Sequence, residues 1–308
     1  MRRRSVLALG GGALALGLGQ ARAQEARAGA RPPDRLEFVG RFRWRLDDPA
    51  FGGWSAIEVR EDGVGFFALS DRSLLVEGRF LRDGAGRITA IESGPIRPLT
   101  LKSGRLAGLD SEGLTLAPDG RLFISEEGTH RILGSRNPGR DLTSLPPLPG
   151  ARDFLPNRSL EALAFGPDGA LYTLPELSRS RRGTPIYRLR RGRWEIPYTI
   201  AHDPDWAAVG ADFGPSGTFY LLERGFSPFA GFRSRLRAFR FAPEGATELP
   251  PLLETPFRRY GNLEGLSVWQ DAEGRERFTM ISDDNFLPFG LHTDIVEYCA
   301  LAPLPVGR

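Results

Sequence analysis

Acidic residues recur at matching positions of a hairpin-like repeat, and their spacing is the strongest chemical signal in this sequence. Each copy reads as an apolar strand, a turn rich in Pro, Asp and Gly, and a second strand that ends in acids. Near the start of the first strand, three copies carry a glutamate: Glu112, Glu161 and Glu264. In an antiparallel hairpin the start of one strand lies beside the end of the next. A ring of carboxylates is therefore expected at one edge of the fold.

Such a ring needs a cation or bound protons, because converging carboxylates repel one another. Carboxylate and carboxamide oxygens are the ligands that Ca²⁺ prefers. We expect Ca²⁺ here, with other divalent metals left open. The predicted metal ligands are Glu112, Glu161, Glu264, Asp284 and Asn285. The alternative is that these strand ends are acidic only because they are solvated.

The same edge holds residues that could complete an ester-hydrolysing site. A bound ion lowers the pKa of a coordinated water and polarises an ester or phosphoryl oxygen. Glu127 or Glu223 would act as the general base, and Arg224 would hold the anionic oxygen. The residues predicted to bind substrate are Arg72, Asp71 and Asp283. For the two arginines, salt bridges to the neighbouring acids are the alternative.

Turn chemistry indicates which elements carry these acids. Asp-Gly and Ser-Gly between apolar runs are hairpin signals, because glycine supplies the positive φ of a tight turn. Five segments follow this pattern: 54–71, 111–127, 160–176, 209–223 and 263–285. Hairpins at intervals of about 50 residues predict an all-β protein, a β-propeller of five or six blades. Residues 186–200 and 234–241 would be outer strands. A β-sandwich with coincidental hairpins is the alternative.

The first 23 residues are expected to be a leader that is removed on export. They combine a cationic start, an apolar run at 6–18 and a small-residue cleavage site ending at Ala23. The run is too short to span a bilayer. Residues 3–7, Arg-Arg-Ser-Val-Leu, match the twin-arginine pattern. This pattern predicts a periplasmic or secreted protein that uses the export machinery for folded chains. A membrane anchor or a disordered tail is the alternative.

Charge limits the classes of partner. The chain has a net charge of +3, but the leader holds four arginines and no acid, so the mature chain would carry −1. A nearly neutral protein is not expected to bind nucleic acid, and cleavage would leave no membrane anchor. The expected layout is a flexible start at 24–36, a single propeller domain at 37–301 and a tail at 302–308.

The remaining motifs say less about chemistry. Cys299 is the only cysteine, so an intramolecular disulfide is excluded. The sequence has no Gly-x-Ser-x-Gly elbow and no His-Glu-x-x-His zinc motif. Three serines that precede strand-end acids are expected to satisfy backbone groups: Ser70, Ser125 and Ser282. The aromatic loop at 226–232 would either wall the mouth of the channel or cover the end of a blade.

Four motifs occur in order along the chain: Asp-Ser-Glu-Gly at 110–113, Leu-Leu-Glu-Arg-Gly-Phe at 221–226, Asn-Leu-Glu-Gly-Leu at 262–266 and Ile-Ser-Asp-Asp-Asn-Phe at 281–286. The set resembles the bacterial phytase-like family that carries the "esterase-like activity of phytase" domain, from about Phe38 to Tyr298. The resemblance implies a propeller-like domain whose Glu and Asp residues are suspected of phosphodiesterase or esterase chemistry. Ser55 and Val209 stand where the other copies have Glu, so the expected ring is partial.

Two functions from different classes follow. The first is an exported, metal-dependent hydrolase of phosphoric or other esters, including lactones and carboxylic esters, with a small-molecule ester as substrate. The second is a non-catalytic propeller that binds a ligand or an envelope partner and uses its acids to hold a structural Ca²⁺. Turnover that disappears when Glu112 and Glu264 are replaced by Gln would favour the enzyme.

Overall fold

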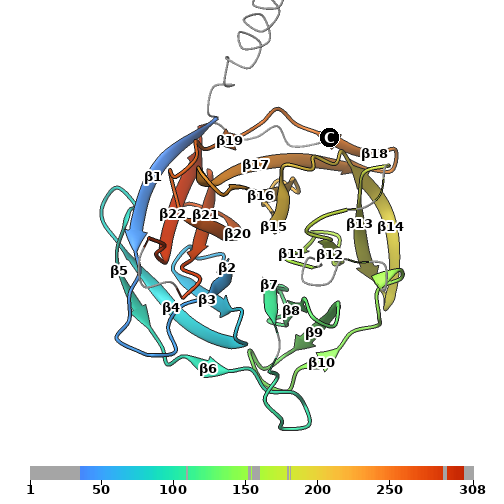
Figure 1. The fold of residues 1–308 in the computed structure, drawn as a ribbon, viewed down its shortest axis with the longest axis horizontal. Helices are drawn as coiled ribbons and strands as arrows, with labels where there is room; N and C mark the ends of the chain where they lie inside the picture. Colours follow the sequence, from blue (N-terminus) through green and yellow to red (C-terminus); the bar gives the residue numbers. More distant parts are fainter. Residues whose placement is uncertain are drawn as a thin grey trace, which may run out of the picture. The chain divides into compact units, whose positions relative to one another are not determined.

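The chain folds into a β-propeller, seen in Figure 1 as small sheets arranged around a central axis. The computed structural model describes residues 35–108, 110–151, 154, 160–178, 180, 182–286 and 290–301. These residues form 22 strands in five antiparallel sheets and contain no α-helix. The predicted propeller is confirmed, and the number of blades is five. The leader, most of the expected flexible start and the tail at 302–308 lie outside the described residues.

Each blade consists of four strands, and two blades add a short fifth strand. Blade 1 contains β2 (Trp54–Val59), β3 (Gly65–Ser70), β4 (Leu74–Arg82), β5 (Ile88–Ser93) and β6 (Arg97–Pro98). Blade 2 contains β7 (Ser111–Leu116), β8 (Leu122–Glu126), β9 (Arg131–Ser135) and β10 (Thr143–Ser144). Blade 3 contains β11 (Ala162–Phe165), β12 (Leu171–Leu174), β13 (Thr184–Arg190) and β14 (Arg193–Ile200).

Blade 4 contains β15 (Ala207–Phe213), β16 (Phe219–Ser227), β17 (Gly231–Ala242), β18 (Gly245–Glu248) and β19 (Leu253–Glu254). Blade 5 contains β20 (Asn262–Gln270), β21 (Glu276–Asp283), β22 (Asp294–Ala300) and β1 (Leu36–Arg43). The first strand of each hairpin faces the centre: β2 packs against β7, β7 against β11, β11 against β15, β15 against β20, and β20 against β2. No helix long and apolar enough to cross a bilayer occurs in the described ranges.

The two ends of the domain close the ring together. Strand β1 comes from the start of the chain, yet it pairs antiparallel with β22 at the end (blue beside red in Figure 1). Buried Asp294 on β22 accepts hydrogen bonds from Arg41, at 2.5 Å, and from Arg43, at 3.3 Å. Blade 5 thus contains both ends of the domain. The pairing of β1 with β22 covers the outer edge of β22 and fixes the circular arrangement of the blades.

The turns follow the chemistry that the sequence predicted. A glycine at positive φ closes the first hairpin of every blade: Gly63, Gly120, Gly169, Gly217 and Gly274. Only a residue without a Cβ adopts this conformation without strain. The hairpins therefore reverse at the predicted residues, and all of these turns lie at the same end of the molecule, opposite the strand-end acids.

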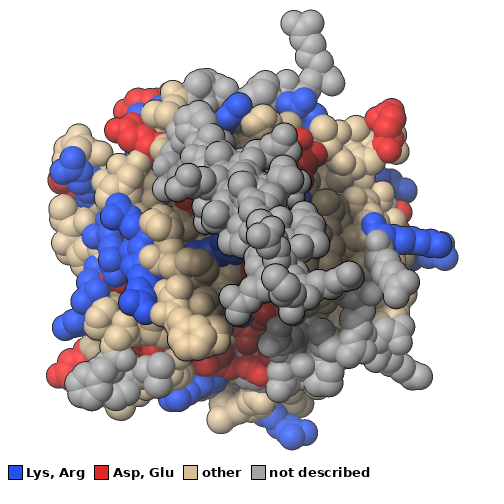
Figure 2. Space-filling model, turned by 45° about the horizontal axis from the view of Figure 1, so that its top comes forward, with Lys and Arg blue, Asp and Glu red and all other residues tan. Residues whose placement is uncertain are grey.

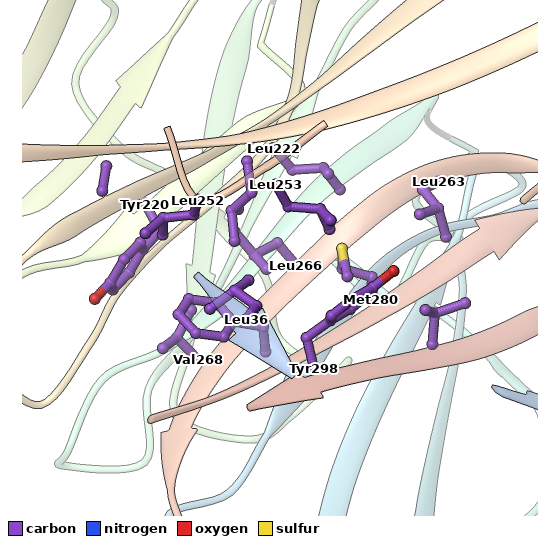
Figure 3. Packing of buried hydrophobic residues seen from close by; sticks show 14 of the residues in the cluster. Leu36, Tyr220, Leu222, Leu252, Leu253, Leu263, Leu266, Val268, Met280 and Tyr298 are labelled. Carbon is purple, nitrogen blue, oxygen red and sulfur yellow. The ribbon is translucent and has the colours of Figure 1, made fainter. Parts of the chain in front are cut away.

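Apolar side chains between neighbouring blades form the core. Between blades 4 and 5, Tyr220 and Leu222 pack with Leu266, Met280 and Tyr298, as Figure 3 shows. Strands β20, β21 and β22 are buried along almost their whole length, on both faces. This is the burial expected of strands sandwiched between two other sheets. The core therefore holds the inner strands in a fixed position relative to one another.

Candidate functional site

A β-bulge lies at the repeated position of the inner strand in four of the five blades. In the first hairpins of blades 1, 2, 4 and 5 the pairing shifts by one residue near the start of the inner strand. In blades 1, 4 and 5 the extra residue is the repeated position itself, Ser55, Val209 or Glu264. In blade 2 the shift falls at Glu112 and Gly113. A bulge leaves one residue unpaired and turns its side chain away from the regular alternation. In blade 3 the ladder starts at Ala162, directly after Glu161.

In blades 2, 4 and 5 a glycine follows the repeated position and lets neighbouring blades approach closely. A Cβ at Gly113 would lie 2.5 Å from the carbonyl oxygen of Glu161, and one at Gly210 would lie 2.6 Å from that of Glu264. A Cβ at Gly265 would lie 2.7 Å from the amide nitrogen of Ile57. These distances leave no room for any other residue type. The Glu-Gly pairs are thus explained by two needs, an acid in the bulge and a bare backbone beside it.

The register of the hairpins brings two sets of equivalent positions to the same mouth of the channel. The first-strand ring consists of Ser55, Glu112, Glu161, Val209 and Glu264. The second-strand ring, counted from the same registers, consists of Asp71, Glu127, Glu176, Arg224 and Asp283. The two rings together carry seven acids and one arginine. Blade 4 is the only blade that supplies no acid to either ring, because it contributes Val209 and the only cation of the two rings, Arg224.

Five of the acids at this mouth form a compact group. Oxygen atoms of Asp110, Glu112 and Glu127 all lie within 4.8 Å of one another, and so do those of Glu127, Glu161 and Glu176. We call these five residues the acidic cluster. Glu127 belongs to both triplets, so the two potential cation sites share a ligand. Each triplet offers only carboxylate oxygens, the donor type that suits a hard divalent cation.

Arg224 is held in place by acids from two neighbouring blades. Its Nη1 donates to Asn262 Oδ1, at 3.1 Å, and to Glu264. Its Nη2 donates to Glu176 Oε1, at 3.2 Å, and lies 4.0 Å from Glu161 Oε2. Burial lowers the pKa of Arg224, but the surrounding carboxylates outweigh burial and raise it above its ordinary value. The guanidinium is therefore charged and fixed at the centre of the site.

Burial and mutual repulsion shift the acids toward their neutral forms. Burial is the main cause that raises the pKa of Glu112, followed by the charges of Glu161 and Glu264. For Glu161 and Glu264, burial also raises the pKa more than Arg224 lowers it. Burial and the charge of Glu264 raise the pKa of Asp283 to about 8. One arginine thus does not neutralise this group of acids, which favours bound protons or a bound cation at neutral pH.

These two rings lie within the region that matches a known family. The family model described as "Phytase-like: Esterase-like activity of phytase" matches residues 49–286. The chain belongs to this phytase-like family. The match starts just before blade 1 and ends just after Asn285, so it includes both rings of the channel mouth. A comparison with curated proteins gives no match.

Solved propeller structures resemble the phytase-like chain at low sequence identity. The α-L-arabinofuranosidase PaAbf62A from Podospora anserina, solved with cellotriose, is 13% identical, with a TM-score of 0.51 over 87% of this chain and 97% of that one. The PQQ-bound aldose sugar dehydrogenase from Streptomyces coelicolor is 13% identical, with a TM-score of 0.47 over 87% and 99%. Virginiamycin B lyase from Staphylococcus aureus is 14% identical, with a TM-score of 0.45 over 86% and 100%. At this identity, the likeness to PaAbf62A bears on the fold alone.

Two of the predicted metal ligands make other contacts in the phytase-like chain. Asp284 Oδ1 accepts the amides of Gly53, at 3.0 Å, and of Phe286, at 3.1 Å. Asn285 Oδ1 accepts from Asn262 Nδ2 at 3.4 Å. Asp284 thus ties the end of β21 to the start of blade 1. Glu112 and Glu161 fall in the acidic cluster, whereas Glu264 is paired with Arg224.

The predicted general base Glu223 lies on the other face of its strand. It accepts hydrogen bonds from Arg235 and, at 3.1 Å, from Arg237. Successive side chains of a strand point to opposite faces, so Glu223 turns away from the contacts of Arg224. It forms a buried ion pair within blade 4. Of the two predicted bases, only Glu127 belongs to the acidic cluster.

The predicted substrate-binding residues occupy the blade 1 and blade 5 side of the mouth. The Arg72 guanidinium lies 3.1 Å from the centroid of the Phe286 ring. Burial raises the pKa of Asp71, whose side chain accepts a hydrogen bond from Ser70 at 3.2 Å. Asp283 accepts the amide of Asn285 at 2.8 Å. These acids extend the group of carboxyl side chains toward blade 1.

The site residues predicted from the sequence leave out three residues at this mouth: Asp110, Glu176 and Asn262. Glu176 is detectable from the sequence, because it ends the second strand of the third copy and the hairpin register places it beside Glu161. Asp110 precedes the second copy, and no periodic signal marks it.

The three strand-end serines bond backbone groups, as predicted. Ser125 Oγ accepts the amide of Gly113 at 2.7 Å, and Ser70 and Ser282 donate to carbonyl oxygens.

A cavity of about 680 Å³ opens beside the acidic cluster. Its polar lining includes Glu176, Arg224, Asn262 and Asn285, and its aromatic lining includes Trp206, Phe226 and Phe232. Figure 2 shows Asp and Glu side chains gathered in the lower middle of the face in view, apart from a group of Lys and Arg side chains at its left. Charge on this protein is therefore local, despite its small net value.

Proposed function

We propose that this phytase-like chain is an exported hydrolase of phosphoric or carboxylic esters that uses a divalent cation, with Ca²⁺ as the expected ion. The observation that carries the proposal is the pair of carboxylate triplets that share Glu127 beside the fixed Arg224. Membership of the phytase-like family supports ester hydrolysis over other reactions. The N-terminal twin-arginine pattern supports export to the periplasm.

The triplet of Asp110, Glu112 and Glu127 is the better fit to a cation. The side chain of Glu112 has no hydrogen bond to the described residues, and burial, followed by the neighbouring acids, raises its pKa. The other triplet already faces Arg224 through Glu161 and Glu176. A cation bound by Asp110, Glu112 and Glu127 would supply Lewis acidity toward an ester or phosphoryl oxygen and would lower the pKa of water.

The protein's own residues would position and activate the reactants. Glu127 would accept a proton from the attacking water, because it is the acid common to both triplets. Arg224 lines the cavity and would bind the anionic oxygen of the ester. Glu176 and Glu264 would keep the guanidinium oriented through the ion pairs described above. Burial of the cluster would strengthen these electrostatic contacts.

The direct test combines metal analysis with a panel of esters. The purified mature protein is expected to contain a stoichiometric divalent cation and to hydrolyse an aryl phosphodiester or aryl carboxylic ester. Chelation should abolish turnover, and Ca²⁺ should restore it. At a hundredfold excess over its Kd, Ca²⁺ should stabilise the fold by about 2.7 kcal/mol.

A matched pair of variants locates the cation. Glu112→Gln should lose both the metal and the turnover, because it removes a charged ligand of the preferred triplet. Glu273→Gln is the control, since Glu273 is exposed on a turn of blade 5. Full metal content and activity in a folded Glu112→Gln protein would refute this assignment of the cation site.

A non-catalytic propeller with a structural cation is the second candidate. It is favoured by the contacts of Arg224, whose two terminal nitrogens already face four side chains of the protein. Chelation would lower the melting temperature in both cases. Only the enzyme would lose turnover of an ester, so the absence of turnover across the whole panel would support this second function.

A further inference from the structure

The hairpin between β16 and β17 extends beyond the channel mouth. Strands β3 and β8 end one residue before the second-strand ring, at Ser70 and Glu126. Strand β16 instead passes Arg224 and continues to Ser227, still paired with β17 as far as Gly231. We call residues 225–233 the aromatic hairpin, because it carries three of the protein's phenylalanines. Blade 4 thus adds a wall above the site.

Contacts from both sides hold the aromatic hairpin in one position. Arg258 donates from Nε to the Ala230 carbonyl, at 3.0 Å, and from Nη2 to the Phe229 carbonyl, at 2.5 Å. The Arg233 guanidinium lies over the Trp206 ring, 4.3 Å from its centroid. The hairpin is therefore preorganised, which lowers the entropic cost of binding a ligand against it.

Two aromatic rings of this hairpin remain exposed to solvent. Phe226 is 61% exposed although it contacts Phe232, with ring centroids 4.9 Å apart, and Phe229 at the tip is 91% exposed. Exposed aromatic side chains on a well-anchored element mark surfaces that bind ligands or partners. Phe226 differs from Phe229 in one respect, because it lines the cavity beside the acidic cluster.

The cavity connects the aromatic hairpin to the candidate catalytic residues. Phe226, Phe232 and Trp206 form its apolar wall, and Arg224 and Glu176 form part of its polar wall. A ligand that fills this space contacts both walls. Its anionic group meets Arg224, and a flat apolar group meets the Phe226 ring, where aromatic stacking adds to the burial of apolar area.

We infer that the aromatic hairpin is a substrate subsite that selects anionic esters carrying an aromatic group. The inference rests on the proposed function because it calls the ligand a substrate. Binding of the ligand to this subsite does not itself require turnover. Phe226 is the specificity-determining residue of this subsite, and Arg224 binds the anionic part of the same molecule. Esters with only a small alkyl group fill the polar half of the cavity and leave the Phe226 wall bare.

Binding of two phosphonates, which are not hydrolysed, tests this inference in the full mature protein with Ca²⁺ present. Phenylphosphonate and methylphosphonate carry the same charged group and differ only in the ring. We expect phenylphosphonate to bind about tenfold more tightly by calorimetry, with a change in Trp fluorescence. Phe226→Ala should remove that preference and leave methylphosphonate binding unchanged.

Phe229→Ala is the matched control, because Phe229 lies on the same hairpin but does not line the cavity. It should keep the tenfold preference. Equal affinity of the two phosphonates, or equal loss of preference in both variants, would overturn the inference. A preserved preference without turnover of any ester would leave the subsite in place and refute only the hydrolase. Turnover of an ester without the preference for phenylphosphonate would refute the subsite and leave the hydrolase in place.

Discussion

The two ends of the propeller channel both contain buried carboxylates, yet they use them differently. One end of the channel holds the hairpin turns, and we call it the turn end. There, Glu58 on β2 and Asp212 on β15 line a cavity of about 780 Å³ together with hairpin turns. Burial, and then the charge of Asp212, raises the pKa of Glu58, and burial raises the pKa of Asp212 to about 7. By the direction of these pKa shifts alone, the turn end resembles the end that holds the acidic cluster, which we call the acidic end.

Hydrogen bonds separate the two ends. Asp212 accepts the amide of Val268 on the next blade at 2.6 Å and its neighbour's amide, that of Phe213, at 2.7 Å. Glu58 accepts the backbone of Leu116. Glu58 and Asp212 therefore each bond an inner strand of a neighbouring blade. Within the acidic cluster, by contrast, carboxylates face one another across 4.8 Å or less. The contrast teaches that the partners of a buried acid, and not its burial, indicate whether it links blades or binds a ligand.

The largest expected effect compares one glutamate from each end. Glu127→Gln should lower kcat/KM at least a hundredfold, because it removes the proposed general base. In the metal-free protein its melting temperature should stay equal or rise, since one repelling charge is lost. Glu58→Gln should leave kcat/KM unchanged, because Glu58 lies at the turn end. Steady-state kinetics and thermal unfolding of both variants measure this difference. An equal loss of turnover in both variants would show that the two ends do not differ in function.

A second, smaller effect tests whether the backbone positions the acids. Gly113→Ala places a Cβ 2.5 Å from the Glu161 carbonyl oxygen and forces apart the strands that present Glu112 and Glu161. We expect it to lower the free energy of unfolding by about 1 to 3 kcal/mol, the usual range for overpacking, and to weaken metal binding. Urea unfolding and metal titration measure both quantities. Gly128→Ala in the same blade is the control, because a Cβ there meets nothing within 4 Å.

The sequence was sufficient for the hairpins and for most of the acidic end because both depend on local signals. Asp-Gly turns, alternating apolar residues and the antiparallel register place Glu112, Glu161 and Glu264 at one mouth without knowledge of the tertiary contacts. The count of five blades needed the structure, because β1 belongs to the last blade although it comes first in the chain. Sequence order alone does not reveal that closure.

What could not be predicted depends on long-range partners. Glu223 and Arg224 are adjacent in the sequence, yet one pairs within its own blade and the other reaches two neighbouring blades. Asp284 was predicted as a ligand, but an amide 231 residues earlier, that of Gly53, occupies one of its oxygens. Asp212 looks like an ordinary strand residue until the amide of Val268 is found beside it. Residue type and spacing give the candidates, and the partners decide among them.

The smallest expected effect is a change in the pH dependence of stability at the turn end. The folded-state pKa of Asp212, about 7, lies above its ordinary value of 3.8, so the folded protein binds this proton more tightly than the unfolded chain does. The stability from this group is fully present below about pH 3.8 and is lost as the pH rises through 7.

Asp212→Asn keeps one of the two acceptor oxygens, in neutral form at every pH, and it also removes the negative charge that faces Glu58. The variant should therefore gain stability relative to the natural protein as the pH rises from 4.5 to 8. Urea unfolding at the two pH values measures this difference. A stability difference that stays constant across the range would mean that Asp212 does not titrate there. In that case its two amide bonds would outweigh its burial, and the turn end would differ from the acidic end in electrostatics as well as in hydrogen bonding.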